Sequence, residues 1–484
     1  MERITLRDIA GYCSAKDFEV DLGISVEGIS VDSRSLRQGE LFIPIIGERF
    51  DGHNFIDQAR AAGAVAVLSS RKDSDPGTLY VDDTLQALLD IACGYRKRFS
   101  VKVTAITGSV GKTTTKEMIA AVLAEFAPTL KTEGNLNNLV GLPLSLLRLA
   151  GGHRAAVFEM GMNHLGEISR MTRAALPDIA VITNIGTAHI EHLGSREGIL
   201  KAKTEIFEGL GEEGTVILNG DDQLLWGLRN KLPFRTVFYG IENKDCDIIG
   251  VNISQDSRVG TRFVASTPTG EMDMFLPAIG RHNILNALAA VAVGLEYTRG
   301  NVKSTDPKEV ERKIALGISR FRSAEMRQNI LHAGGLTIID DCYNANPDSM
   351  SAALSVLRTY PSHGKRIAVL GDMLELGDYS EQAHRSLGEE AARSSDHIFL
   401  FGTASEHTLL GAIQSGKPTS AIAHFESREE LANELLELAG PGDVILLKGS
   451  RGMKLEMVRD MLLNHFGEGS SSENEDKLSS KSEA

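Results

Sequence analysis

The fold is decided by residues 101–126, VKVTAITGSVGKTTTKEMIAAVLAEF. The β-branched run at its start predicts a buried strand, and the segment from Lys112 onward predicts a helix. Between them TGSVGKTT, residues 107–114, fits the short pattern GxxGK[ST], although Ile106 stands where the longer phosphate-loop pattern has glycine. Glycines let backbone N–H groups turn toward a phosphate, Lys112 adds a charge, and Thr113 can offer a hydroxyl to magnesium. The stretch therefore predicts a triphosphate-binding loop, with an ordinary turn as the alternative.

Strands and helices alternate beyond this stretch. The runs AAVFEMG, DIAVITNIG and GTVILNG are separated by helix-length segments, which predicts crossovers and a parallel sheet. Residues 247–277 alternate polar and apolar positions between turn residues and predict antiparallel hairpins, followed by a helix that begins near Arg281. A fresh strand and helix series after residue 316 predicts a further domain of Rossmann-like character.

The predicted fold class is α/β with three domains. We expect a small mixed α/β domain over residues 1–99, a central P-loop-type parallel-sheet ATPase domain with antiparallel hairpins over 100–315, and a C-terminal Rossmann-like α/β domain over 316–467. Residues 468–484 are polar, charged and without periodicity, which predicts a disordered tail.

Composition excludes several classes of function. The net charge of -14 argues against a general nucleic-acid binder, because such proteins present a basic face to phosphates. The four cysteines are far apart and form neither a zinc pattern nor a disulfide framework. The N-terminus lacks the basic and apolar regions of a signal peptide, and the apolar stretch 284–295 is too short to span a membrane. We therefore expect a cytoplasmic protein without stable membrane insertion.

A triphosphate needs more positive charge than the loop supplies. A helix terminus contributes only about 0.3–1 kcal/mol toward an anion, and one lysine cannot neutralise three phosphates, so metal ligands are expected elsewhere. Glu159 ends the predicted strand AAVFE, at the sheet edge where open α/β folds bind ligands. His189 also follows a strand. Both are magnesium-ligand candidates; the alternatives are a solvated glutamate and a structural histidine.

Taken in order, five segments resemble the central domain of the Mur ligases: TGSVGKTT, TEGNLNNLVGLPLSLL, FEMGMNHLGEI, TNIGTAHIEHLGS and AKTEIF. GRHNILNALAA resembles the family's adenine-side helix. DDCYNANPDSM, VLGDMLELG and LLKGSRGMKLE resemble its C-terminal domain, and VDSRSLRQGELFIPIIGERFDGHNFIDQA resembles its UDP-sugar-binding unit. The similarity extends over all three predicted domains.

The resemblance implies roles for individual residues around ATP. It implies that the triphosphate is bound by Thr107, Gly108, Ser109, Val110, Gly111, Lys112 and Thr113, and that Lys112, Glu159, His189 and Lys203 are catalytic. Two Mg²⁺ ions would be held by Thr113, Glu159, His189 and a carbamylated Lys203. The alternative for Lys203 is an ordinary surface lysine, and Lys201 lies nearby. Asn286 would contact adenine, and Arg327 and Asp341 would reach ATP; an ion-pair arginine and a turn aspartate are the alternatives.

The resemblance is greatest to the family members that add D-alanyl-D-alanine, because Asn344 stands where lysine- or diaminopimelate-adding relatives typically have histidine. It implies an ATP-dependent ligase that joins D-alanyl-D-alanine to a UDP-N-acetylmuramoyl-tripeptide through an acyl phosphate, in peptidoglycan precursor synthesis, and we expect a monomer. Substrate-binding residues would be Ser33, Arg34, Glu48, Arg49, Asp51, His53, Asn135, Asn137, Asn138 and Asn344. Whether the third peptide residue is lysine or diaminopimelate stays open, as does the base that deprotonates the amine.

Two other functions would explain part of the sequence. A P-loop switch or ATPase that controls a protein partner explains residues 107–114 alone, but neither the lysine in AKTEIF nor the asparagine cluster GNLNN. The other rival is another ligase, such as a relative that adds a different amino acid or folylpolyglutamate synthetase. ATP turnover with a UDP-muramoyl tripeptide, with and without D-alanyl-D-alanine, separates all three.

Overall fold

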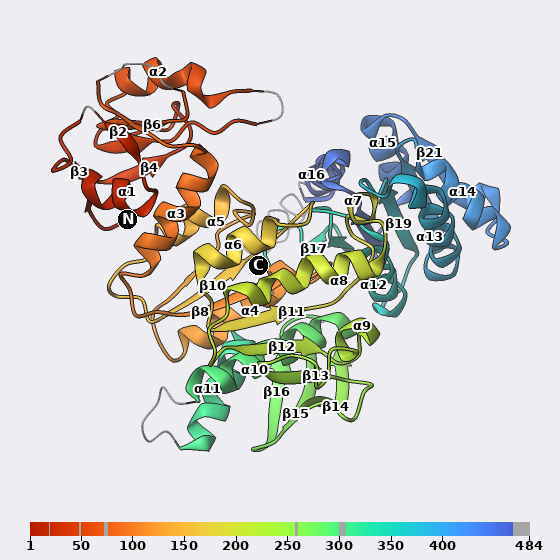
Figure 1. Cartoon of the computed structure of the whole chain (residues 1–484). Helices are drawn as coiled ribbons and strands as arrows, with labels where there is room; N and C mark the ends of the chain where they lie inside the picture. The colour runs from red at the N-terminus through yellow and green to blue at the C-terminus, as the bar shows by residue number, and fades with distance from the viewer. Residues whose placement is uncertain (19, 48–49, 72–75, 257–259, 300–305, 468–484) are drawn as a thin grey trace, which may run out of the picture.

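The computed structural model describes residues 1–18, 20–47, 50–71, 76–256, 260–299 and 306–467. The predicted substrate residues Glu48 and Arg49 and the predicted tail, residues 468–484, lie outside the described residues. The chain forms three units, each built around its own sheet, and the central unit lies between the other two (Figure 1). None of the helices in the described ranges is both long and apolar enough to cross a membrane.

The first unit contains a five-stranded sheet in the order β2-β7-β6-β5-β4, in which only β2 runs antiparallel to its neighbour. A small pair, β1 and β3, lies apart from it. The strands are β1 (Ile4–Thr5), β2 (Lys16–Phe18), β3 (Ser25–Val26), β4 (Gly28–Ser30), β5 (Glu40–Phe42), β6 (Ala66–Ser69) and β7 (Thr78–Tyr80), and the helices are α1 (Leu6–Tyr12), α2 (Ile56–Ala61) and α3 (Thr84–Arg96).

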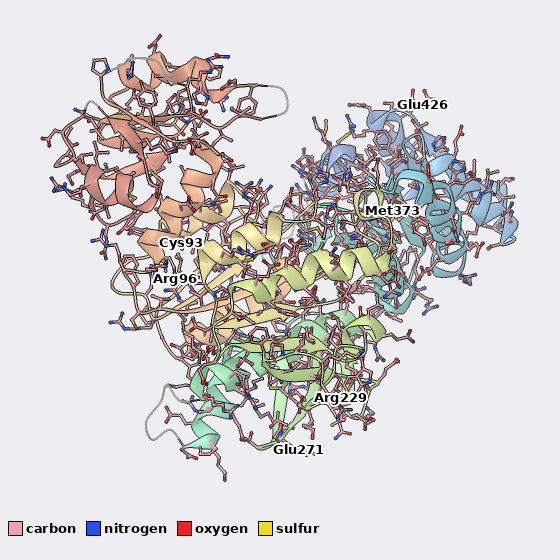
Figure 2. All side chains as sticks on the ribbon, in the orientation of Figure 1. Cys93, Arg96, Arg229, Glu271, Met373 and Glu426 are labelled. Carbon is pink, nitrogen blue, oxygen red and sulfur yellow. The ribbon has the colours of Figure 1, made fainter. Side chains whose placement is uncertain are left out.

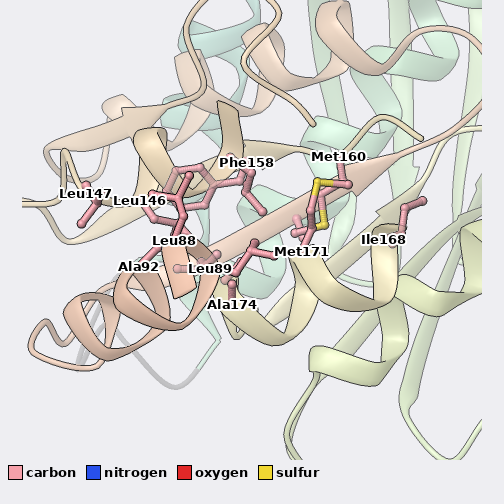
Figure 3. Packing of buried hydrophobic residues seen from close by; sticks show 14 of the residues in the cluster. Leu88, Leu89, Ala92, Leu146, Leu147, Phe158, Met160, Ile168, Met171 and Ala174 are labelled. Carbon is pink, nitrogen blue, oxygen red and sulfur yellow. The ribbon is translucent and has the colours of Figure 1, made fainter. Parts of the chain in front are cut away.

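Helix α3 fixes the first unit to the central one. Its Leu88 and Leu89 belong to the same buried cluster as Phe158 of the central sheet and Met171 of a central helix (Figure 3). Arg96, at the end of α3, donates hydrogen bonds to the carbonyls of residues 175 and 101 at 3.1 and 2.9 Å (Figure 2). The two units therefore share one apolar core across the junction.

The central unit is a nine-stranded sheet in the order β16-β15-β14-β13-β12-β11-β8-β10-β9. Along this order, all neighbouring strands between β9 and β14, including β8, pair in parallel. Strand β15 pairs antiparallel with both β14 and β16, as predicted for residues 247–277. The strands are β8 (Lys102–Thr107), β9 (Thr129–Lys131), β10 (Ala155–Glu159), β11 (Ile179–Ile182), β12 (Thr215–Asn219), β13 (Arg235–Gly240), β14 (Ile248–Asp256), β15 (Gly260–Thr267) and β16 (Gly270–Leu276).

Eight helices accompany this sheet in the described ranges: α4 (Lys112–Ala124), α5 (Gly141–Leu146), α6 (Glu167–Ala175), α7 (Ile190–Leu193), α8 (Arg196–Thr204), α9 (Gln223–Trp226), α10 (Arg281–Thr298) and α11 (Pro307–Ser319). Helix α10 is apolar on nearly every side because it packs among α4, α11 and the strands β12 to β15. The apolar stretch 284–295 is therefore a buried core helix.

The third unit is a six-stranded sheet in the order β17-β18-β22-β19-β20-β21, parallel except for the edge strand β17. Its strands are β17 (Asn329–Ala333), β18 (Leu336–Asp340), β19 (Arg366–Gly371), β20 (His397–Phe401), β21 (Ile422–Phe425) and β22 (Val444–Lys448), and its helices are α12 (Pro347–Thr359), α13 (Ser380–Ser394), α14 (Ser405–Gln414), α15 (Arg428–Leu438) and α16 (Glu456–Gly467).

The predicted boundary between residues 315 and 316 falls inside helix α11. Helix α11 packs against α4 and β16 of the central unit, with Val310, Ile314 and Ile318 buried in the central core. Because a helix that buries its apolar face there belongs to that core, we propose to place the limit of the central domain after α11.

Candidate active site

The carboxyl ends of the central strands face the third unit across a cavity of about 390 Å³. The predicted ATP and metal residues that line it are Ser109, Val110, Gly111, Lys112, Thr113, Glu159, His189, Asn286, Arg327 and Asp341, and the predicted substrate residues that line it are Asn135, Asn137, Asn138 and Asn344. Of the predicted residues that the structure describes, Thr107, Gly108, Lys203, Ser33, Arg34, Asp51 and His53 are not part of this lining.

Two glycines let the phosphate loop turn sharply between β8 and α4. A Cβ at Gly108 would collide with the hydroxyl of Thr183. Gly111 has a φ of 80°, a left-handed conformation that favours glycine, and a Cβ there would lie 2.6 Å from Asn286 Oδ1. The turn carries the start of α4 to the cavity wall, where the first N–H groups of a helix have no intrahelical partner.

Part of the loop is bonded within the protein. Asn184 Oδ1 accepts hydrogen bonds from the amides of Ser109 and Val110 at 3.2 and 3.0 Å. The Thr107 hydroxyl donates to the carbonyl of Met160 at 2.8 Å, and Thr107 is fully buried. The hydroxyl of Thr107 is therefore enclosed and already bonded, so it does not face the cavity.

A carboxylate, a hydroxyl and an amine converge at the start of α4. Thr113 Oγ1 donates to Glu159 Oε2 at 2.9 Å, and Asn137 Nδ2 donates to Glu159 Oε1 at 2.8 Å. The Lys112 amine donates to the carbonyl of Gly108 at 2.9 Å. Burial lowers the pKa of Lys112, and the nearby charge of Glu159 opposes that shift. Glu159 itself is only 2% exposed at the end of β10, so its charge acts in a partly dehydrated environment.

His189 lies on the side of the cavity that faces the third unit. It precedes α7 with a φ of 64°, and its Nδ1 lies 2.8 Å from Oε2 of Glu375. Nδ1 is buried and makes no hydrogen bond to another described residue, so Glu375 is the polar group closest to it that is identified. The imidazole lowers the pKa of the Glu375 carboxyl, which keeps Glu375 ionised.

Lys203 and Lys201 are distinguished by burial. Lys201 is exposed on α8, whereas Lys203 is 2% exposed, which selects Lys203 as the buried lysine of the AKTEIF segment. Burial lowers the pKa of the Lys203 amine well below its ordinary range, and the positive charge of Lys112 lowers it further. An uncharged amine can attack carbon dioxide, whereas an ammonium ion cannot. The surroundings of Lys203 therefore favour the chemistry of carbamylation.

The donor set fits magnesium bound together with phosphates. Within the described ranges no three His, Cys, Asp or Glu side chains gather into a complete metal site. Magnesium does not require one, because it usually keeps several waters and binds one or two carboxylates plus substrate phosphates. Glu159, Thr113 and His189 line one cavity, whereas the buried Lys203 lies outside this lining.

Helix α10 holds Asn286 against the phosphate loop. Asn286 Oδ1 accepts a hydrogen bond from Thr115 Oγ1 at 3.0 Å, and its Nδ2 donates to Asn283 Oδ1 at 3.3 Å. The residue is 6% exposed. A contact with adenine would have to replace or share one of these hydrogen bonds.

Residues 320–328, between α11 and β17, form the linker to the third unit. This linker brings a guanidinium to the phosphate loop. Arg327 stacks over the Tyr343 ring at 4.0 Å, and its Nη2 donates to Thr113 Oγ1 at 3.5 Å. Met326 and Gln328, on either side, have φ values of 57° and 51°, so the backbone on both sides of Arg327 is in the left-handed region. The linker thus holds Arg327 over the start of α4.

The third unit contributes a buried ion pair to the same cavity. Asp341 Oδ2 lies 2.7 Å from Nζ of Lys448, and Asp341 Oδ1 accepts a hydrogen bond from the Gln328 amide at 3.2 Å. The Lys448 amine also donates to the carbonyl of Asn344 at 3.0 Å. Asp341 is therefore held rigidly opposite the phosphate loop.

The predicted substrate residues of the first unit make local structure. Both ring nitrogens of His53 are engaged, because Nδ1 lies 2.7 Å from Asp51 Oδ1 and Nε2 accepts from the Ser70 amide at 3.2 Å. A direct contact between His53 and a sugar does not fit this geometry. Arg34 is exposed and its hydrogen bond to Asp32 lowers the pKa of Asp32 to about 2.

Some predicted substrate-binding side chains are hydrogen-bonded within the protein. Asn138 Oδ1 accepts from the amides of Val140 and Gly141 at 3.1 and 2.8 Å, where α5 begins. Asn344 Oδ1 accepts from the Ala345 amide at 2.9 Å. Ser33 Oγ donates to Gln58 Oε1 at 3.0 Å.

Residues of the cavity lining that were not predicted from the sequence include Asn184, Asn283, Gln328, Tyr343 and Lys448. Asn184 follows β11 and Lys448 ends β22, so their positions at the carboxyl ends of parallel strands were an available signal. Gln328 and Tyr343 carry no such signal, because only the linker brings them to the phosphate loop.

Comparison with known proteins was consistent across the chain. Residues 25–94 match the model of the Mur ligase family catalytic domain, residues 106–294 the Mur ligase middle domain, and residues 326–451 the Mur ligase glutamate ligase domain. The UDP-N-acetylmuramoyl-tripeptide–D-alanyl-D-alanine ligase of Bacillus subtilis strain 168 is 41% identical over 90% of this chain and 93% of its own length.

Solved structures give the same result. A crystal structure of MurF from Acinetobacter baumannii superposes with a TM-score of 0.86 at 32% identity, covering 96% of this chain and 99% of that one. The MurF ligase of Thermotoga maritima in complex with ADP gives a TM-score of 0.79 at 29% identity, covering 91% and 98%. The similarity extends over nearly the full length of both chains in every case, and the chain belongs to the Mur ligase family.

Proposed function

We propose that this chain is an ATP-dependent ligase that joins D-alanyl-D-alanine to a UDP-N-acetylmuramoyl-tripeptide. One observation carries the proposal: the phosphate loop, Glu159 and His189 of the central unit line the same cavity as Arg327 and Asp341. The relatives named above are ligases for these two substrates, and they match this chain over nearly their whole length.

The reaction has two steps. The terminal carboxylate of the tripeptide attacks the γ-phosphorus of ATP, which forms an acyl phosphate and releases ADP. The amine of D-alanyl-D-alanine then attacks the acyl carbon, and phosphate leaves. Phosphorylation is needed because a free carboxylate is anionic and has no good leaving group.

The chain's own residues bind and orient the reactants. Lys112 and the start of α4 would bind the triphosphate, and Arg327 would add positive charge from the linker, which is the electrostatic work that phosphoryl transfer mainly requires. Two magnesium ions, held by Thr113, Glu159, His189 and a carbamylated Lys203, would offset the repulsion between carboxylate and triphosphate. Docking of the third unit over the cavity would keep water from the acyl phosphate.

We also propose how the units divide the work. The first domain would bind the UDP-sugar, with exposed Arg34 as its best-placed candidate, the central domain would bind ATP, and the third would bring D-alanyl-D-alanine. We place the reaction in the cytoplasm, where ATP and nucleotide-linked precursors are available. A monomer suffices, because residues of one chain line the whole cavity.

The test measures ADP release by purified protein with UDP-muramoyl-tripeptide, with and without D-alanyl-D-alanine, together with mass spectrometry of the product. We expect release to depend on both substrates and the product mass to equal tripeptide plus dipeptide minus water. Parallel assays with the lysine and the diaminopimelate tripeptide identify the third residue. ADP release that ignores both substrates would instead indicate a nucleotide switch.

A further inference from the structure

The third unit contacts one central loop with two carboxylates. Glu375, in the loop after β19, places Oε2 2.8 Å from Nδ1 of His189. Asp348, in the first turn of α12, accepts a hydrogen bond from the Thr187 amide at 3.1 Å. Figure 1 shows α7, which begins directly after His189, beside the third unit. Both contacts fall on the loop that leads from β11 to α7.

The same loop also holds the phosphate loop. Asn184 bonds the amides of Ser109 and Val110, and the Gly186 amide donates to Ser109 Oγ at 2.9 Å. A displacement of this loop would therefore move the phosphate loop as well as the histidine. The position of the third unit is thus connected to the site by direct contacts.

A histidine that binds a metal usually donates its other ring N–H to a carboxylate, which fixes the tautomer and the ring orientation. Glu375 is the carboxylate beside Nδ1 of His189, and this leaves Nε2 available for an ion. Both residues have positive φ values, 63° and 64°, which non-glycine residues seldom adopt unless the surrounding structure holds them there.

The contact has little value for the stability of the fold. The Glu375 side chain is 52% exposed, and ion pairs with an exposed partner contribute little. A role in holding the domains together by itself is therefore a weak explanation for this carboxylate. Orientation of the imidazole is an effect that does not depend on a large interaction energy.

We propose that Glu375 is a positioning residue, which the third unit supplies across the domain interface to orient His189 for the metal ion. The inference rests on the proposed function, because it requires His189 to be a metal ligand. It follows that the metal site is complete only when the third unit is docked, so that tight metal binding and domain closure occur together.

The test uses Mn²⁺ as a spectroscopic probe of the full-length chain in the presence of ADP, with free Mn²⁺ measured by electron paramagnetic resonance. We expect Glu375→Ala to weaken Mn²⁺ binding about 10- to 100-fold, and the isosteric Glu375→Gln to weaken it less, because an amide oxygen at this place can also accept a hydrogen bond from Nδ1. Asp378→Ala is the matched control, since Asp378 is an exposed carboxylate three residues along the same loop. It should stay within about twofold of the unchanged chain.

A second measurement follows the Mg²⁺ requirement of ligation. For Glu375→Ala the Mg²⁺ concentration at half-maximal rate should rise, whereas kcat at saturating Mg²⁺ should recover most of its value. A merely structural role would lower kcat at every Mg²⁺ concentration.

The variant His189→Ala tests separately whether His189 is a metal ligand. If His189→Ala weakens Mn²⁺ binding while both Glu375 variants bind it as Asp378→Ala does, the role of Glu375 is refuted and the metal site stands. If His189→Ala also binds Mn²⁺ normally, His189 is not a ligand, and the proposed metal site falls together with the inference.

Discussion

Lys203 is the residue at which the proposed metal site is most directly tested. Lys203→Ala removes the amine that would carry the carbamate, so ligation should fall by about 100-fold or more. Formate or acetate should restore part of the rate, because a small carboxylate can occupy the space and supply the missing oxygens. Lys201→Ala, on the exposed side of the same helix, is the control and should keep its activity. Full activity of Lys203→Ala would remove Lys203 from the metal site.

The lowered pKa of Lys203 also determines how the stability of the folded chain should depend on pH in the absence of carbon dioxide. Its pKa is lowered in the folded chain and ordinary in the unfolded chain, so the unfolded chain binds more protons near neutral pH. Stability should therefore rise with pH until the unfolded amine also loses its proton. Lys203→Met removes this buried amine and should be more stable near neutrality, with a flatter dependence on pH.

The measurement is urea unfolding in carbon dioxide-depleted buffer from about pH 6 to 9. Some slope should remain in Lys203→Met, because burial also lowers the pKa of Lys112. Lys201→Met should keep the full slope. Equal slopes in the two variants would contradict a neutral, buried Lys203.

For individual residues, the sequence predicted the site best where a motif combined several residue types. Lys112 and Thr113 of the phosphate loop and Glu159 at a strand end do line one cavity. The sequence could not show which predicted side chains are already hydrogen-bonded within the protein. For Thr107 and His53 these hydrogen bonds join segments that are distant in the sequence. Burial separated Lys203 from Lys201, and burial depends on the packing of the whole unit.

The phosphate loop is the element whose shape depends most on glycine. Gly111→Ala forces a methyl group into a position 2.6 Å from Asn286 Oδ1 at a φ of 80°. We expect a loss of about 1–3 kcal/mol in the free energy of unfolding and a larger loss in nucleotide affinity, because the start of α4 must move. Urea unfolding and calorimetric titration with ADP measure the two effects.

Gly152→Ala is the control for this change, because Gly152 lies in open space and lacks a left-handed φ. It should leave both quantities nearly unchanged. Normal ADP affinity in Gly111→Ala would mean that the close approach to Asn286 is not needed for nucleotide binding.

Elements with a strong pattern were predictable, and short ones were not. The β-branched strand β8, the hairpins β14 to β16 and the helix α10 were expected from periodicity and turn residues. Strand β9 has three residues and β21 has four, which is too short for a period to emerge. Strand β17 exists through its antiparallel pairing with β18, a property of the sheet rather than of its own sequence.

For the whole molecule, the sequence predicted an α/β chain of three units, but it could not predict how they meet. The shared core between α3 and the central helices and the stacking of Arg327 on Tyr343 are contacts between units. Such contacts depend on the relative orientation of folded bodies. This is also why the boundary at residue 315 fell inside α11, whose apolar face is explained only by the central core.

Because the central unit, the linker and the third unit line one cavity, nucleotide should stabilise them together. At about 100 times its dissociation constant, ADP with Mg²⁺ should stabilise the folded chain by about 2.7 kcal/mol. Hydrogen exchange measured by mass spectrometry should then show slower exchange in β18 and α12 as well as in α4. Arg327→Ala removes the guanidinium that lies between Thr113 and Tyr343, so ADP should still protect α4 but protect the third unit much less.

The affinity of Arg327→Ala for ADP should fall about 10- to 100-fold, as expected for the loss of hydrogen bonds from a charged group. Arg312→Ala, on the exposed face of α11, is the control and should retain both affinity and protection. Undiminished protection of β18 and α12 in Arg327→Ala would mean that another contact, such as the Asp341 and Gln328 pair, transmits nucleotide binding to the third unit. The exchange pattern therefore identifies which residue of the linker couples ATP to domain docking.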